Sequence, residues 1–237
     1  MIEVSSASDI GRVRTSNEDS YGVFPPAVYV VADGLGGHAA GEVASRMVVA
    51  AVHDMANEGG VLDTASLQSA ILRANAQVLT AAVNNSSYEG MGSTATVLHI
   101  DEGTGMAYYA HVGDSRLYLL RHGVFRQVSR DHSYVEELVA RGQLSEEEAQ
   151  RHPRKNLLLR AVGIEERLHV DGDVFPLEAG DRLLLATDGL TNMVDDRELA
   201  ALLGGDFTGV AERMVECALV GGGSDNITAI AIAYEMP

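Results

Sequence analysis

The sequence predicts an α+β fold in which strands and paired helices form a layered sandwich. Strand-like runs come in blocks that are separated by two helices in succession, whereas a doubly wound α/β fold alternates strands with single helices. The chain has 237 residues, and 46% of them are hydrophobic, which is enough for one large domain with a sizeable core. We therefore expect one domain rather than two.

The first elements are two strands followed by two helices. "YGVF" and "AVYVVAD" have the short apolar runs of strands, and the turn at Pro25-Pro26 joins them. From His38 to about Asn57, and again over about 64–83, apolar residues recur at helical spacing.

Strands dominate the rest of the chain, with one charged interruption. Turns that contain glycine separate the expected strands "STATVLHI", "GMAYYAHVGD", "SRLYLLRHG" and "VFRQVS". The stretch "HSYVEELVARGQLSEEEAQRHPRKN" then predicts one or two short exposed helices inserted between strands. Further strands are expected at "RLHVDGDVF", "DRLLLATDG" and "DNITAIAIAYE", with helices at about 195–203 and 208–219.

The composition excludes several classes of protein. Asp and Glu total 34 against 17 Lys and Arg, and this net charge of −17 argues against nucleic-acid binding, which relies on basic patches. No stretch reaches the roughly 20 apolar residues of a membrane span, and no signal peptide is evident at the N-terminus. The single cysteine, Cys217, excludes an internal disulfide framework and suits a reducing compartment. We expect a soluble cytoplasmic protein that binds neither nucleic acid nor a membrane.

Four apolar strands carry an aspartate at one end: Asp33, Asp114, Asp188 and Asp225. Each alone is compatible with an ordinary turn. If the strands share one edge of a sandwich, however, the carboxylates converge and require cations to neutralise them. Oxygen ligands favour Mg²⁺ or Mn²⁺, and the eight histidines form no H-x-x-x-H or H-E-x-x-H arrangement for zinc. Two such cations can activate a water for the hydrolysis of a phosphate ester.

The segment "RTSNEDS" places Arg14 close to Glu18 and Asp19. Two interpretations are open, since such a cluster can be a polar loop with a surface ion pair, or a guanidinium that binds phosphate beside the cations. His38 is similarly ambiguous, because it can be a solvated residue at a helix start or an acid for a leaving group.

The glycine-rich turn at residues 34–39 also satisfies the G-x-G-x-x-A form of a dinucleotide-binding loop. A nucleotide-binding protein is therefore a rival hypothesis. The anionic Asp33 at the head of the loop would repel a pyrophosphate, and that fold requires a strand, not a second helix, after the first helix.

Seven motifs resemble, in order and spacing, those of the metal-dependent serine/threonine protein phosphatases of type 2C, and the compact bacterial members in particular. They are "RTSNEDS", "VVADGLGGHAAGEVAS", "GSTAT", "HVGDSRLYLLR", "SRDHSYVEELVARG", "LLLATDGLTNMV" and "GSDNITAIAI". The resemblance runs from about residue 3 to 235. It implies a four-layer α-β-β-α sandwich of two antiparallel sheets flanked by helices. It also implies that residues 1–237 are a single catalytic domain with a mobile flap at about 133–165.

The resemblance further implies a metal site. Asp33 would bridge two metal ions, the carbonyl group of Gly34 would bind the second ion, and Asp188 and Asp225 would complete the ligands of the first. Asp114 would hold a third, weaker ion together with Asp188. The implied cofactors are Mn²⁺ or Mg²⁺, as two core ions with an optional third.

The remaining implied residues serve the substrate. Arg14 would bind its phosphate, Glu18 and Asp19 would act mainly through metal-bound waters, and His38 would be the general acid. The implied reaction is the hydrolysis of phosphoserine and phosphothreonine in proteins by a hydroxide that bridges the two metals, without a phosphoenzyme. It would reverse Ser/Thr kinase signalling.

The resemblance implies phosphoprotein partners, including a Ser/Thr kinase or its targets, and we expect a monomer. Two alternatives stay open. One is a non-catalytic, metal-stabilised interaction module, and the other is a small-molecule phosphatase of the same fold.

Overall fold

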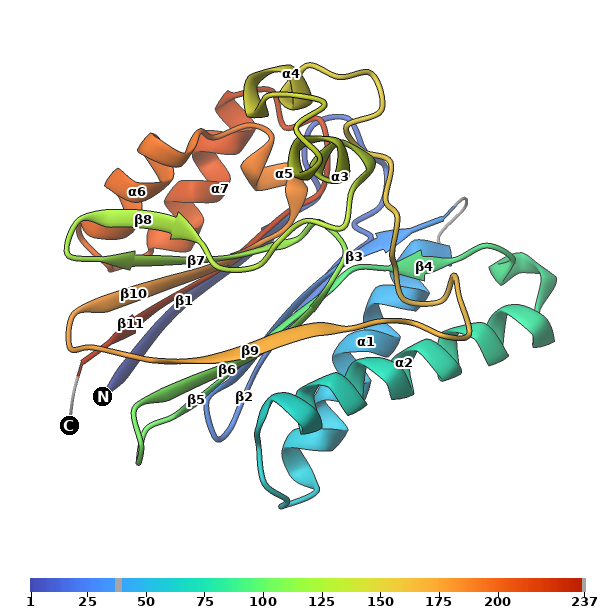
Figure 1. The fold of residues 1–237 in the computed structure, drawn as a ribbon, viewed down its shortest axis with the longest axis horizontal. Coiled ribbons are helices and arrows are strands. Elements are labelled where there is room, and N and C mark those ends of the chain that lie inside the picture. The colour runs from blue at the N-terminus through green and yellow to red at the C-terminus, as the bar shows by residue number, and fades with distance from the viewer. Residues whose placement is uncertain (37–39, 236–237) are drawn as a thin grey trace.

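Two antiparallel sheets packed face to face form the centre of the protein, with helices on both outer sides (Figure 1). The computed structural model describes residues 1–36 and 40–235. The predicted α+β fold, a four-layer sandwich, is confirmed.

Each sheet is a path of antiparallel strands. The first sheet has the order β1 (Ile2–Asp9), β11 (Ile227–Tyr234), β10 (Asp181–Ala186), β7 (Arg116–Arg121) and β8 (Val124–Gln127). The second sheet has the order β2 (Asp19–Phe24), β3 (Val28–Leu35), β5 (Ala95–Asp101), β6 (Met106–Val112) and β9 (Asp171–Pro176), and the short β4 (Gly92–Ser93) pairs with the end of β3.

The helices cover the outer faces of the two sheets. The second sheet carries α1 (Ala40–Asn57) and α2 (Thr64–Asn84), and the first carries α6 (Asp196–Gly204) and α7 (Val210–Val220). Shorter helices lie in the connections, namely η1 (Ser86–Tyr88), α3 (Tyr134–Ala140), α4 (Glu146–Gln150) and α5 (Asp188–Thr191). Within the described ranges, no helix combines the length and the apolar character that crossing a membrane requires.

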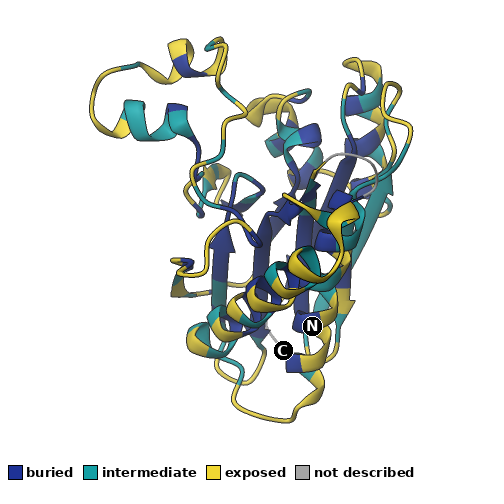
Figure 2. Cartoon of the chain, turned by 90° about the vertical axis from the view of Figure 1, so that its right-hand side faces the viewer, coloured by how far each residue is buried: buried dark blue, intermediate teal, exposed yellow. Residues whose placement is uncertain are grey.

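Strand β11 shows how the sequence specifies the layers. Successive side chains of a strand point to opposite faces, and in "ITAIAIAY" both faces are buried. Ile230 and Ile232 pack between the sheets, whereas Ala229 and Ala231 face the helical layer. Figure 2 shows the same pattern throughout, with buried strands beneath helices whose outward faces are exposed. The strand that follows Asp225 is therefore held firmly on both sides.

The segment at about 133–165, which the family resemblance implies to be a flap, carries α3 and α4 and is held at its base by backbone hydrogen bonds. Tyr134 N donates to Leu157 O at 2.8 Å, and Leu159 N donates to His132 O at 2.8 Å. The expectation of short helices between strands is confirmed.

Three elements differ from the sequence prediction. The sequence does not predict β1, because "IEVSSASD" is rich in serine and lacks an apolar run. The strand lies at a sheet edge, and all but one of its residues are partly buried. The strand expected at 167–175 begins only at Asp171. Leu168 and Val170, before it, are buried beside the helices without being in a strand, so their apolar spacing is misleading. The short α5 is also not predicted.

Candidate active site

The strand order brings the four predicted aspartates to one edge of the sandwich. In the second sheet β3 and β6 both pair antiparallel with β5, so their C-terminal ends, with Asp33 and Asp114, lie on the same side. In the first sheet the end of β10 adjoins the start of the antiparallel β11, which brings Asp188 close to Asp225. The packing of the sheets then places the two pairs around one space.

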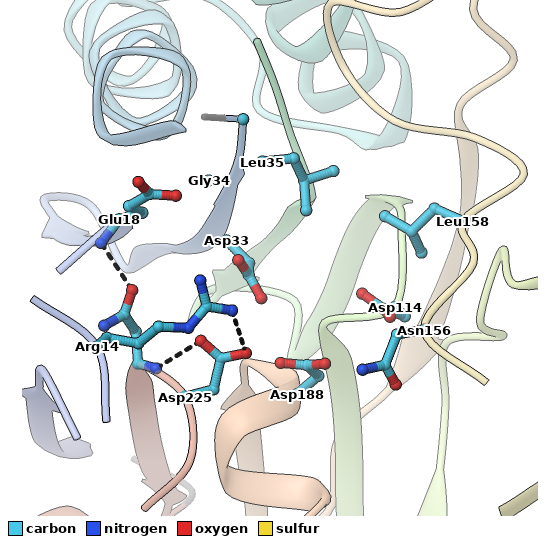
Figure 3. Close-up of a pocket in the computed structure, with 12 residues that line it drawn as sticks. Arg14, Glu18, Asp33, Gly34, Leu35, Asp114, Asn156, Leu158, Asp188 and Asp225 are labelled. Atoms are coloured by element: carbon cyan, nitrogen blue, oxygen red, sulfur yellow. Dashed lines mark hydrogen bonds and ion pairs between the residues drawn. The ribbon is translucent and has the colours of Figure 1, made fainter. Parts of the chain in front are cut away.

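That space is a pocket of about 190 Å³. In Figure 3 the four carboxylates point into it, while Asn156 and Leu158 lie at one side. The lining residues are Arg14, Glu18, Asp33, Gly34, Leu35, Gly36, Asp114, Asn156, Leu158, Asp188, Asp225 and Asn226.

Asp33 is held by residues of the "GSTAT" and "VGDS" motifs. Its backbone N–H donates to Thr94 Oγ1 at 2.8 Å, and Thr94 N donates to its carbonyl oxygen at 2.9 Å. Thr94 Oγ1 also lies 2.7 Å from Ser115 Oγ. These polar side chains are fully buried, so they fix the backbone from which the Asp33 carboxylate enters the pocket.

The turn after Asp33 permits a close approach that only glycine allows. A Cβ atom on Gly34 would collide with the Gly41 carbonyl group and lie 2.5 Å from Glu18 O. Gly34 N donates to that same Glu18 oxygen at 3.1 Å. The absence of a side chain therefore lets β3 lie directly against the loop that carries Glu18.

Arg14 lies on the same side of the pocket as Glu18 and forms an ion pair with Asp225 (Figure 3). Its Nη2 donates to Asp225 Oδ2 at 2.8 Å, and half of its side-chain surface is exposed. The pair with Asp225 and nearby Glu18 raise the pKa of Arg14, so the guanidinium stays charged. This cation is positioned at the edge of a pocket that is otherwise acidic.

Asp19, at the start of β2, connects the two sheets beneath the pocket. Its Oδ2 accepts hydrogen bonds from Thr187 Oγ1 at 2.8 Å and from Thr228 Oγ1 at 2.7 Å. Burial, followed by the charges of Asp188 and Asp225, raises the pKa of Asp19 to about 7, although both threonine bonds oppose this shift.

The same causes act on the other carboxylates. Burial and then Asp19 and Asp188 raise the pKa of Asp33 well above its ordinary value. Burial and then Asp188 raise the pKa of Asp114 to about 8, and burial and then Asp225 raise that of Asp188. The protein therefore concentrates negative charge in a place where water solvates it poorly, an arrangement that cations stabilise.

The donor atoms fit divalent cations. Asp19 Oδ1 and Asp188 Oδ1 are buried and have no hydrogen-bond partner among the residues that the structure describes, which leaves two carboxylate oxygens available at the site. Over residues 1–36 and 40–235, no group of three or more His, Cys, Asp or Glu side chains is arranged so that it could hold a metal ion. Besides carboxylates, Mg²⁺ and Mn²⁺ commonly take backbone carbonyl groups and water as ligands.

The predicted site residues Arg14, Glu18, Asp33, Gly34, Asp114, Asp188 and Asp225 line one pocket, and Asp19 lies beneath it. His38, the predicted general acid, lies outside the described residues.

Sequence reasoning missed Asn156 and Leu158, which reach the pocket from the segment after α4, and the buried Asn226. The position of Asn226 directly after Asp225 in "SDN" is the one signal that could have drawn attention to it.

A two-sheet sandwich whose edge gathers carboxylates and one arginine around a pocket has the features of a metal-dependent phosphohydrolase. Residues 12–226 match the family described as Protein phosphatase 2C, and the chain belongs to this family.

Relatives support this assignment over most of the chain. A serine/threonine phosphatase, stp, of Listeria innocua is 41% identical over 95% of this chain and 93% of its own length. The serine/threonine protein phosphatase PstP of Mycobacterium tuberculosis is 39% identical over 97% of this chain, which corresponds to 44% of that protein.

Solved structures agree with the sequence comparison. The crystal structure of the M. tuberculosis phosphatase PstP/Ppp superimposes with a TM-score of 0.91 at 36% identity and covers 99% of both chains. A structure of the PstP catalytic domain in complex with two manganese ions has a TM-score of 0.88 at 35% identity, covering 98% of this chain and 97% of that chain.

Proposed function

We propose that this chain is a metal-dependent phosphatase that hydrolyses phosphoserine and phosphothreonine in proteins. The observation that carries this proposal is the convergence of four strand-end aspartates and Arg14 around one pocket in a phosphatase 2C fold. An activity on phosphoproteins is also the activity for which the stp and PstP relatives are named.

We assign the metal ligands to the residues that line the pocket. Asp33 would contact both core ions, with the Gly34 carbonyl group, Asp188 and Asp225 as further ligands, and Asp114 would serve a third ion together with Asp188. When bound, Mn²⁺ or Mg²⁺ supplies an acidified water and neutralises charge on the phosphate. Two observations support this assignment: Asp188 Oδ1 is buried without a hydrogen-bond partner among the described residues, and the pKa values of Asp33, Asp114 and Asp188 are raised.

Arg14 is the residue that would bind the substrate phosphate. Its guanidinium is half exposed at the pocket edge, and its planar donors match the oxygens of a phosphate group. As charge shifts onto these oxygens during hydrolysis, the fixed guanidinium would stabilise it.

The other assignments concern water and the leaving group. Glu18 and Asp19 would orient water at the metal site through their carboxylates. His38 would donate a proton to the departing serine or threonine oxygen, since an alkoxide leaves poorly without one.

We further propose that residues 1–237 are one catalytic domain and that 133–165 act as a flap over the pocket. Asn156 and Leu158 support this role, because they bring that segment into the lining of the pocket. We also propose that the protein acts as a monomer, in the cytoplasm, on a Ser/Thr kinase or its targets. The one cysteine, which is free, suits the reducing conditions of the cytoplasm.

The test is phosphate release from phosphoserine, phosphothreonine and phosphotyrosine peptides with Mn²⁺ and with EDTA. We expect turnover of the first two peptides with Mn²⁺ and none with EDTA. Binding of Mn²⁺ without turnover would support the interaction module instead, and turnover of small phosphate esters alone would support a small-molecule phosphatase. Trapping of a covalent phosphoenzyme would contradict direct attack by water.

A further inference from the structure

The side chain of Asn226 forms three hydrogen bonds to the backbone of one loop. It is buried, with 4% of its surface exposed, and its Nδ2 donates to Ile10 O and to Ser16 O, both at 2.9 Å. Its Oδ1 accepts from Glu18 N at 2.8 Å. One amide thus binds backbone atoms at both ends of residues 10–18.

The loop that Asn226 holds carries the phosphate-binding arginine. Residues 12–15 are exposed, so packing contributes little to the position of Arg14. The loop has other anchors, such as Arg12 N to Gly223 O at 2.7 Å and Asn17 Nδ2 to Ser8 Oγ at 3.0 Å. Asn226, however, binds the chain on both sides of Arg14 and itself lines the pocket.

Asn226 is also connected directly to the aspartates. Its backbone N–H donates to Asp225 Oδ1 at 2.8 Å, while the other oxygen of Asp225 accepts from Arg14 (Figure 3). Gly189, next to Asp188, lies so close to Asn226 O that a Cβ atom there would collide with it. The arginine loop and both carboxylates of the first sheet therefore meet at Asn226.

We propose that Asn226 is a positioning residue that sets the distance between the phosphate-binding Arg14 and the carboxylates Asp188 and Asp225. This inference rests on the proposed function of Arg14. Only an asparagine side chain supplies two donors and one acceptor at this length. An aspartate would direct a carboxylate oxygen at two carbonyl oxygens, and an alanine would leave three backbone groups without partners.

The test compares Asn226→Ala and Asn226→Ser with Asn75→Ala in Mn²⁺-saturated assays on a phosphothreonine peptide. Asn75 is a matched control, because it is 3% exposed and its amide also clamps backbone, donating to Glu165 O at 2.8 Å and accepting from Gly163 N at 2.7 Å. Among the residues that the structure describes, Asn75 is not one of those that line the pocket.

We expect Asn226→Ala to lower kcat/KM by about tenfold or more and to raise the inhibition constant of inorganic phosphate. Asn226→Ser, which keeps one hydroxyl, should show a smaller effect of the same kind and covers the case in which the alanine variant does not fold. Asn75→Ala should lower the melting temperature and leave kcat/KM within about twofold of the wild-type value.

A double-mutant cycle with Arg14→Ala separates positioning from general damage. If Asn226 acts through Arg14, its substitution in the Arg14→Ala background should change kcat/KM by less than about threefold. The inference would be overturned if the fold-loss of kcat/KM in the double variant equalled the product of the losses in the two single variants. Wild-type kcat/KM in both Asn226 variants would also overturn it. Absence of Mn²⁺-dependent turnover in the wild-type protein would instead refute the proposed function.

Discussion

Thr228 on β11 donates a hydrogen bond of 2.7 Å to Asp19 on β2, and this bond joins the two sheets beneath the active-site pocket. Thr187, at the end of β10, donates to the same carboxylate oxygen. The second oxygen of Asp19 is buried and accepts no hydrogen bond from any residue that the structure describes. One side chain thus links the sheets structurally and also contributes charge to the site.

Substitution Asp19→Asn should separate these two roles. The amide oxygen can still accept from the threonines, while the amide nitrogen removes a negative charge close to Asp33 and Asp188. In EDTA we expect stabilisation of about 1 kcal/mol, or roughly 2–4 °C in melting temperature for a chain of this size. The increase in melting temperature on adding Mn²⁺ should become smaller.

Differential scanning calorimetry with EDTA and with Mn²⁺ measures both effects. Asp54, near the end of α1, is exposed and supplies the control Asp54→Asn. This substitution should change neither the melting temperature in EDTA nor its increase on adding Mn²⁺. A lower melting temperature of Asp19→Asn in EDTA would show that the carboxylate is needed for the link between the sheets.

Gly34→Ala should disrupt the site through packing alone. Its Cβ atom would collide with the Gly41 carbonyl group and approach Glu18 O to 2.5 Å, and these are backbone atoms that cannot turn aside. We expect a loss of about 1–3 kcal/mol in stability, as for other overpacked positions, together with most of the activity. Gly60→Ala is the control, because a Cβ atom at Gly60 meets no atom within 4 Å among the described residues. Urea unfolding measures the free energy of unfolding of both variants. Equal values for Gly34→Ala and Gly60→Ala would contradict the predicted collision.

The sequence predicts the four aspartates well because each one interrupts an apolar strand at its end. Asp33, Asp114, Asp188 and Asp225 are visible as breaks in a local pattern, and strand order alone brings them together. The layered fold is predicted for the same reason, since strands buried on both faces read as continuous apolar runs.

The contacts that support the site were not predictable in this way. Thr228 and Asp19 are 209 positions apart, and Asn226 and Glu18 are 208 positions apart. A threonine or asparagine within a strand or turn has no periodic signal that names its distant partner. Strand β1 was missed because an edge strand with serines lacks the apolar contrast of the central strands.

His111 should make the protein less stable in mild acid. Its imidazole is fully buried, with Nε2 donating to Arg130 O at 3.1 Å, and burial, followed by the neighbouring His132, lowers its pKa to about 4. Asp131 and Asp171 oppose this shift. Between about pH 6.5 and 4 the unfolded chain binds a proton that the folded protein excludes, so stability falls as the pH falls through this range. The full effect is on the order of 3 kcal/mol.

Urea unfolding at several pH values, in EDTA, isolates this contribution as a difference between proteins. The raised pKa values of Asp19 and Asp114 act in the opposite direction in both proteins, so they cancel in the comparison. The variant His111→Gln should be less stable at pH 7 but lose less stability on acidification. Parallel profiles of the wild-type protein and His111→Gln would show that the imidazole becomes protonated without cost in the folded state.

Asp188→Asn should remove most of the activity, because Asp188 is assigned to a core metal and to the third one. Its Oδ2 accepts a hydrogen bond from Asn192 Nδ2 at 3.0 Å, and its Oδ1 is buried without a partner over residues 1–36 and 40–235. The amide would keep the size of the side chain but lose the charge that binds cations. We therefore expect kcat/KM to fall by about 100-fold or more, since losing even a residue that supports a metal ligand typically costs about 10- to 100-fold. The measurement is turnover of a phosphothreonine peptide over a range of Mn²⁺ concentrations. Asp173→Asn, on the exposed part of β9, is the control and should match the wild-type protein. Near wild-type turnover of Asp188→Asn at saturating Mn²⁺ would contradict the assignment of Asp188 as a metal ligand.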